Sequence, residues 1–237
     1  MTTHIMGPIG LVVASVFGLG LASLPGSGSQ STEPVVVELY QSQGCSSCPP
    51  ANEILNRLAD RRDILALSFS VTYWDQLGWK DTFANEAFTA RQWDFARARG
   101  RGNVATPQFV VAGRTIVSGS DPGALDSAMK QARNVSGGPQ ISVQGSRVLI
   151  GAAPAREPAT VWLVRYDPRE RLVSIGRGEN GGRVLPHRNI VTGLRELGTW
   201  TGKPVTFAQP PYRDSQQRSA VLVQQGTGGP ILSARVI

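Results

Sequence analysis

The two cysteines of the 237-residue chain lie three positions apart, in the stretch "ELYQSQGCSSCPPANEIL". Cys45 and Cys48 stand between a short apolar run and a helical pattern, so we expect them at the N-terminus and in the first turn of a helix. Unpaired backbone N–H groups and the helix dipole favour a thiolate there, and a thiolate is the form that attacks a disulfide. The spacing therefore predicts a dithiol–disulfide exchange centre in which Cys45 is the more exposed thiol.

A structural disulfide is the alternative for this pair of cysteines. Oxidised pairs are common in exported proteins. However, a disulfide that closes so short a ring removes little entropy from the unfolded chain and stabilises the fold only weakly. The sequence thus favours exchange, and a binding or adaptor protein with a passive disulfide remains the alternative function.

Histidine is scarce, which limits the metal sites and catalytic groups that the chain can build. If the N-terminal segment is removed, His187 is the only histidine left. A structural zinc site needs four ligands, and the two cysteines with His187 supply too few. Serine–histidine hydrolysis would depend on His187 without a Gly-x-Ser-x-Gly turn to present the nucleophile. Copper binding by Cys45, Cys48 and His187 stays open as a third function, while the main prediction includes no metal and no cofactor.

Two further positions fit the predicted exchange centre. Thr106-Pro107 begins a strand expected beside the start of the helix, where a cis X-Pro bond leaves backbone free to pair with an extended substrate segment. Glu38 lies in the apolar strand before Cys45, and a carboxyl beneath the thiols can accept or pass their proton. A solvent-facing residue at a strand end is an equally good interpretation of Glu38.

Aromatic residues are concentrated in the segment from Tyr73 to Phe95, which holds seven of the 16 in the chain. This segment either packs as a satellite core or forms an aromatic wall over the thiols. Packing is favoured, and Tyr73 and Trp74 together with Thr106 are the candidates for contact with a substrate.

The hydrophobic pattern predicts an α/β domain followed by a β-rich one. Strands are expected at residues 34–41, 63–71, 108–112 and 115–118, and helices at residues 49–61, 85–99 and 121–133. Two βα crossovers, an antiparallel pair and a closing helix are typical of a thioredoxin-like fold, here over residues 33–136 with an inserted aromatic-rich segment. Short β segments with Gly and Pro between them predict an all-β, sandwich-like domain over residues 137–237. Within that domain, "RNIVTGLREL" is expected to form a single helix.

The first 32 residues are expected to direct export. An apolar run from Ile9 to Leu24 and the flexible tract "PGSGSQST" predict a secretory signal peptide, hence a periplasmic or secreted protein with no stable membrane insertion after cleavage. An uncleaved anchor is the alternative. The net charge of +7 comes from scattered arginines rather than a basic stripe, which argues against nucleic acid as a partner. Because the chain has no third cysteine, its partners are expected to be protein thiols or disulfides and a separate redox protein.

Four stretches together resemble an uncharacterised family of exported bacterial thioredoxin-like proteins, the domain-of-unknown-function family 1223. They are "VVVELYQSQGCSSCPPAN", "YWDQLGWKDTFAN", "TPQFVVAGR" and "GRGENGGRVLPHRNIVTGLRELGTW", and the likeness extends from Pro34 to the C-terminus. The resemblance implies a thioredoxin-like domain followed by a β domain, without an established substrate. A looser similarity to thioredoxins implies that Cys45 attacks, Cys48 resolves and Pro107 is the cis-proline. The chain departs from thioredoxins in the Ser-Ser between its cysteines, so the redox direction is not implied, and in Glu38, which lies one residue further from the first cysteine than their buried acid.

Overall fold

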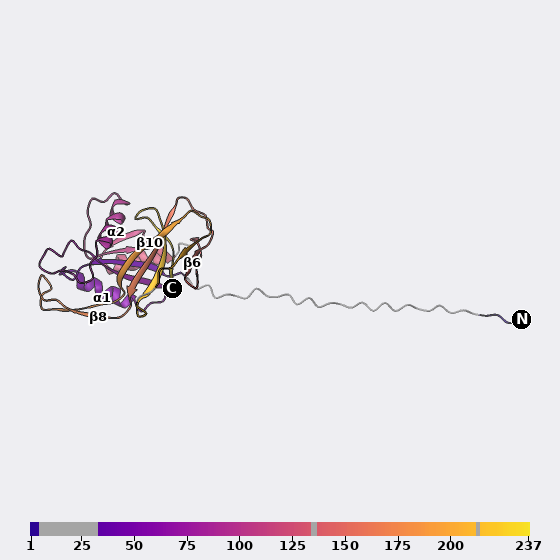
Figure 1. Ribbon diagram of the computed structural model, residues 1–237, viewed down its shortest axis with the longest axis horizontal. Coiled ribbons are helices and arrows are strands. Elements are labelled where there is room, and N and C mark those ends of the chain that lie inside the picture. The colour runs from indigo at the N-terminus through magenta and orange to yellow at the C-terminus, as the bar shows by residue number, and fades with distance from the viewer. Residues whose placement is uncertain (5–32, 134–136, 212–213) are drawn as a thin grey trace. The chain divides into compact units, whose positions relative to one another are not determined.

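The computed structural model describes residues 1–4, 33–133, 137–211 and 214–237. The described residues from Glu33 to Ile237 form one compact unit (Figure 1). Residues 5–32, which include the apolar run of the predicted signal peptide, lie outside the described residues. Within the described part of the chain, no helix is both long enough and apolar enough to cross a membrane.

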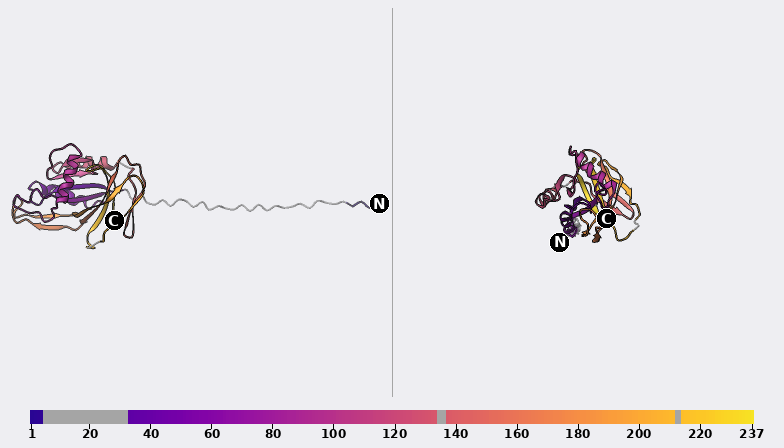
Figure 2. Two further views of the ribbon diagram at one scale, coloured as in Figure 1. Left: turned by 45° about the horizontal axis from the view of Figure 1, so that its top comes forward. Right: turned by 90° about the vertical axis from the view of Figure 1, so that its left-hand side faces the viewer.

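One mixed sheet of eight strands forms the centre of this unit, in the order β13-β12-β7-β10-β2-β1-β3-β4 (Figures 1 and 2). Strand β2 pairs in parallel with β1 on one side and with β10 on the other, and the remaining neighbours are antiparallel. The strands are β1 (Val35–Gln41), β2 (Ile64–Ser70), β3 (Gln108–Val111), β4 (Thr115–Ser118), β7 (Ala159–Asp167), β10 (Ile190–Trp200), β12 (Arg218–Gln225) and β13 (Ile231–Val236).

Three helices cover the part of the sheet around β1 and β2, which are buried along their whole length. They are α1 (Cys48–Leu58), α2 (Glu86–Arg97) and α3 (Pro122–Arg133). Side chains alternate across a strand, so Leu39 packs with α1 and α3 while its neighbour Tyr40 packs with α2. The predicted order of strands and helices up to residue 133 is confirmed.

Two small sheets complete the C-terminal part. One has the order β11-β6-β5 and packs its apolar face on β7 and β12, and the other is the hairpin β8-β9. Their strands are β5 (Ile141–Gln144), β6 (Arg147–Ile150), β8 (Arg171–Ser174), β9 (Val184–His187) and β11 (Val205–Ala208). The β-rich composition predicted for this half of the chain is therefore present.

The two predicted domains share the eight-stranded sheet. Ile190 of β10 is the register partner of Ser68 of β2, and the Ser68 N–H donates to the Asn189 carbonyl over 3.0 Å. One core cluster contains Phe69 of β2 together with Tyr166 of β7 and Leu222 of β12. The two parts share a sheet because β2 is buried along its whole length and needs a neighbour on each edge. Strand β1 covers one edge and β10 covers the other, so strands from beyond residue 137 complete the core around β2.

The helix predicted in "RNIVTGLREL" is wrong, because Arg188 and Asn189 connect β9 to β10 and residues 190–197 form the first part of β10. Ile190, Val191 and Thr192 are β-branched residues, which fit a pleated surface, and Gly193 disfavours a helix. Pairing with β7 along the whole of β10 decides the outcome, with a register shift between Val191 and Gly193.

Candidate functional site

Cys45 and Cys48 form a disulfide bond at the junction of β1 and α1. Ser47 is the N-cap of α1 and Cys48 its first residue, with proline in the first turn, where a missing N–H leaves no hydrogen bond unmade. Cys45 precedes the helix, and its carbonyl accepts from the Cys48 N–H over 3.1 Å. The predicted position of the pair at the start of a helix is therefore confirmed.

Neither cysteine is open to solvent in this disulfide-bonded form. Cys45 is 0% exposed and Cys48 is 1% exposed, whereas Ser46 and Ser47 between them are exposed. This disulfide-bonded form does not show Cys45 to be the more exposed of the two, and the expectation for the free thiols stays a prediction. The tip of the loop therefore lies in water while the sulfur-bearing residues are covered.

The loop between β8 and β9 supplies part of this cover. The buried Asn180 side chain donates through Nδ2 to the carbonyl oxygens of Gln43 and Cys45, each over 2.9 Å. The Ser46 N–H donates to Oε2 of Glu179 over 3.1 Å. Residues 179 and 180 thus bind both sides of the Cys45 backbone, although they lie more than 130 positions away in the chain.

Trp79 supports the same loop from the aromatic-rich segment. A Cβ placed on Gly176 would lie 3.2 Å from the Trp79 ring, and one on Gly178 would lie 3.2 Å from the Trp79 Cβ. The indole Nε1 of Trp79 donates to Oε1 of Gln43 over 2.9 Å. Glycine at these two positions lets the loop pass close to Trp79, and Trp79 in turn binds the segment between β1 and Cys45.

Helix α1 contacts β9 through Asn52, one turn after Cys48. Asn52 Nδ2 donates to the Pro186 carbonyl over 2.6 Å and lies 3.0 Å from His187 Nδ1. Nδ1 must then accept, so the neutral ring carries its proton on Nε2. Burial lowers the pKa of His187 to about 4. In the described part of the chain, His187 Nε2 and Asn52 Oδ1 are buried without a hydrogen-bond partner.

The copper interpretation gains no support from this arrangement. Among the described residues, no three or more His, Cys, Asp or Glu side chains form a group that could hold a metal ion. The Nδ1 atom of His187 is already engaged by Asn52, and the two sulfurs are bonded to each other.

Asp81 is a buried acid near the thiol loop that the sequence did not reveal. Its Oδ2 accepts from the Gln43 N–H and its Oδ1 from the Phe83 N–H, each over 2.8 Å. Burial raises the pKa of Asp81 to about 6, although these N–H donors oppose the shift. The sequence signal for a buried acid was its place in a segment rich in aromatic residues, because such a segment is expected to pack against the core.

The Thr106–Pro107 peptide bond is cis, as predicted. Trp74 Nε1 donates to Thr106 Oγ1 over 2.7 Å, and a Cβ on Gly44 would lie 3.7 Å from the Trp74 Cβ. A Cβ on Gly119 would lie 2.5 Å from the Pro107 Cβ and 3.0 Å from the Cβ of Ala51 in α1. The structure therefore brings Trp74 and Thr106-Pro107 to the end of the sheet where the thiol loop begins.

The aromatic-rich segment is mainly packed, as favoured from the sequence. Tyr73 and Trp74 are half-buried against the core cluster that includes α2, and the Tyr73 hydroxyl donates to Gln92 Oε1 over 3.1 Å. Burial raises the pKa of Tyr73 to about 12. Tyr73 is therefore held by α2 as a neutral hydroxyl.

Glu38 does not lie beneath the thiols. Glu38 lies on the same face of β1 as Tyr40, and this face packs against α2. Helix α1 packs on the opposite face, which carries Leu39. The Glu38 carboxylate accepts from Arg91 Nε over 2.9 Å, Arg91 Nη2 over 2.7 Å and the Tyr40 hydroxyl over 2.6 Å. The predicted proton relay is replaced by a buried ion pair, because the alternation of the strand turns Glu38 away from α1.

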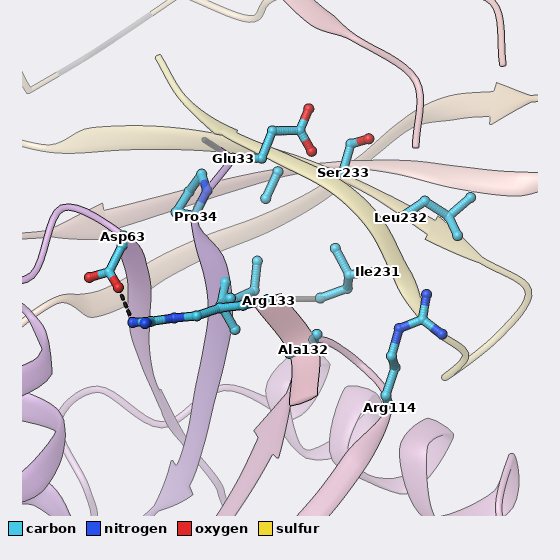
Figure 3. Close-up of a pocket in the computed structure, with 13 residues that line it drawn as sticks. Glu33, Pro34, Asp63, Arg114, Ala132, Arg133, Ile231, Leu232 and Ser233 are labelled. Carbon is cyan, nitrogen blue, oxygen red and sulfur yellow. Dashed lines mark hydrogen bonds and ion pairs between the residues drawn. The ribbon is translucent and has the colours of Figure 1, made fainter. Parts of the chain in front are cut away.

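A cavity of about 380 Å³ lies at the opposite end of β1 (Figure 3). Val35, Ile231 and Ala132 line its apolar part, and Arg133 at its wall is paired with Asp63. The length of β1 separates this cavity from the thiol loop by about 20 Å, at ~3.3 Å per residue. It is therefore not part of the thiol site.

Comparisons with known proteins identify the family. No curated protein matches the chain. Protein AGR_C_4864 from Agrobacterium tumefaciens, known from an X-ray crystal structure, is 32% identical, with a TM-score of 0.72 over 88% of this chain and 96% of that one. HBP35 of Porphyromonas gingivalis is 11% identical, with a TM-score of 0.61 over 87% of this chain and 75% of that one, which is a similarity of fold alone. The model of the family described as "Protein of unknown function (DUF1223)" matches residues 36–224, which include the thiol loop and its cover. The chain therefore belongs to the DUF1223 family.

Proposed function

We propose that the protein is an exported thiol–disulfide oxidoreductase that uses Cys45 and Cys48 on a thioredoxin-like scaffold. The observation that carries this proposal is the disulfide at the start of α1, since so short a ring contributes little as a structural crosslink. The sheet order β2-β1-β3-β4, with α1, α2 and α3 packed on it, supports the scaffold. The proximity of Pro107 and Trp74 to the thiol loop supports a place for a substrate segment.

The reaction is an exchange of two electrons with a dithiol partner. A partner thiolate attacks the sulfur of Cys45, the Cys45–Cys48 bond breaks, and Cys48 leaves as a thiolate that takes up a proton. The second thiolate of the partner then attacks the partner sulfur of the mixed disulfide. This step releases Cys45 as a thiolate, which also takes up a proton. The partner is oxidised to a disulfide and loses two protons, while the cysteine pair is reduced and gains two. The same steps run in reverse for a partner disulfide.

A passive disulfide in a binding or adaptor protein is the second candidate, and the burial of both cysteines favours it. A partner thiolate reaches Cys45 only if the cover over the loop moves. The two candidates differ in reduction potential, because structural disulfides lie below about −300 mV and exchange centres lie higher.

Titration of the full chain against glutathione tests the proposal. We expect a potential above about −300 mV, mixed disulfides trapped on Cys45 in Cys48→Ser, and none in Cys45→Ser. The Cys45→Ser/Cys48→Ser double variant is the matched control for non-specific capture. A potential below that limit with no trapping would establish the passive disulfide, and trapping only in Cys45→Ser would reverse the two roles. Fractionation of the host cells tests export separately.

A further inference from the structure

We propose that Glu179 is a positioning residue that restrains the Cys45 thiolate and couples the cover of the site to its redox state. This inference rests on the proposed exchange function. The key contact is the hydrogen bond of 3.1 Å from the Ser46 N–H to Glu179 Oε2. Ser46 follows Cys45 directly, and backbone N–H groups at the start of a helix are the donors that stabilise a cysteine thiolate. Glu179 therefore holds its carboxylate on the residue next to Cys45, whose sulfur lies 3.4 Å from the Ser47 hydroxyl.

Glu179 is held in this place by its neighbour. Asn180 is buried and donates to the carbonyls of Gln43 and Cys45, while Arg183 Nη1 donates to Asn180 Oδ1 over 2.8 Å. Backbone bonds from Gly181 to Gly178 and from Gly182 to Ile175 close the loop on itself. Glu179 itself is exposed, so its carboxylate can leave Ser46 for water without exposing core residues.

The charge of Glu179 opposes a second negative charge at Cys45. Hydrogen bonds from the side chain and backbone of Ser46 lower the pKa of Glu179, so it is ionised at neutral pH. Other titratable groups around the loop include Asp81 and Asp75 in the aromatic-rich segment, His187 on β9, and Arg177 and Arg183 in the cover. Of these groups, Glu179 alone accepts a hydrogen bond from the segment between the two cysteines in the described structure.

The redox state of Cys45 then decides whether Glu179 stays on the Ser46 N–H. In the disulfide form Cys45 carries no charge, Glu179 keeps the N–H, and the cover is closed. Reduction adds two electrons and two protons to the disulfide, and ionisation of the Cys45 thiol creates a thiolate beside Glu179. Repulsion between the two anions weakens the hold of Glu179 on the Ser46 N–H, so the cover loosens when Cys45 becomes a nucleophile.

Glu179→Gln in the full chain tests this coupling, with Glu170→Gln as a control of equal charge change. Glu170 is an exposed residue in the connection between β7 and β8. Because exposed charges interact weakly, we expect the Cys45 alkylation rate at pH 7 to rise about threefold in Glu179→Gln. The equilibrium with glutathione should favour the dithiol by about threefold, equivalent to about 15 mV. Both effects should shrink in 1 M salt, where screening is strong, and Glu170→Gln should match the wild type.

Hydrogen exchange of the Ser46 amide gives an independent readout. We expect this amide to exchange faster in the reduced wild type than in the oxidised wild type, and to exchange fast in both forms of Glu179→Gln. Unchanged alkylation and potential in Glu179→Gln would overturn the inference, and if the wild type still exchanges disulfides, the proposed function stands. A shifted potential in Glu179→Gln without trapped partners in Cys48→Ser would support the electrostatic effect of Glu179 on the cysteine pair and would refute exchange with a protein partner.

Discussion

Replacement of Glu38 separates its structural role from a role in the thiol chemistry. Glu38 is 0% exposed and Arg91 4% exposed, and two hydrogen bonds of 2.7 and 2.9 Å join them. Removal of one partner leaves a buried charge without compensation, which costs about 3–5 kcal/mol. We expect Glu38→Gln and Arg91→Met each to lower the free energy of unfolding by about this amount, a large part of the ~5–15 kcal/mol typical of a domain.

Removal of both charges should restore much of the lost stability. Arg91 lies over the Phe95 ring at 5.0 Å, so Met at this position keeps apolar contact. The Tyr40 hydroxyl would lose its acceptor at a cost of about 1–3 kcal/mol, so Tyr40→Phe belongs in the same variant. Burial, followed by the charge of Glu38, raises the pKa of Tyr40 well above its usual value, so this hydroxyl is a donor at all pH values of interest. The triple variant Glu38→Leu/Tyr40→Phe/Arg91→Met is therefore expected to be more stable than either single variant.

Urea unfolding and titration against glutathione measure the two roles separately. We expect the reduction potential of Glu38→Gln to match the wild type, because Glu38 faces α2 and the thiols lie at the start of α1. A loss of less than about 1 kcal/mol in Glu38→Gln would contradict the ion-pair argument. A change in potential as large as that of Glu179→Gln would show that Glu38 acts on the thiols after all.

Three further variants test the packing and the protonation of the site. In Gly119→Ala, the new Cβ would lie 2.5 Å from the Pro107 Cβ and force the Pro107 loop away from α1. We expect the free energy of unfolding in urea to fall by ~1–3 kcal/mol. Gly102→Ala is the control, because a Cβ there meets no atom within 4 Å and should change stability little. The folded pKa of Asp81 is about 6, above its unfolded value of ~3.9, so its contribution to stability grows as the pH falls from 6 to 4. Asp81→Asn should lose this gain. Its free energy of unfolding should therefore fall by about 2 kcal/mol more than that of the wild type between pH 7 and 4.5. The folded pKa of His187 is about 4, below its unfolded value of ~6.5, so its contribution to stability is present above pH 6.5 and is lost as the pH falls toward 4. His187→Gln should therefore be less sensitive to acid than the wild type by a similar amount. An Asp81→Asn variant that is less sensitive to acid, or a His187→Gln variant that is more sensitive, would contradict these assignments.

The elements that carry the thiol centre could be predicted from local sequence patterns. An apolar run before Cys45 and a helical stripe after Cys48 are short-range signals, and both correspond to β1 and α1. Thr106-Pro107 at the start of a strand is likewise a local pattern, because proline removes a donor and restricts its own backbone. Such signals report the burial and the period of a segment without reference to the rest of the chain.

The partners of these elements were decided only by tertiary structure. The alternation of β1 shows that Glu38 and Leu39 lie on opposite faces, but only the packed fold shows that α1 covers the Leu39 face and that Arg91 meets Glu38. The cover over Cys45 comes from Asn180, whose loop reaches the thiols because β10 joins the edge of β2. A hydrophobic pattern is compatible with many strand pairings, and the choice among them depends on how completely each buries the shared core.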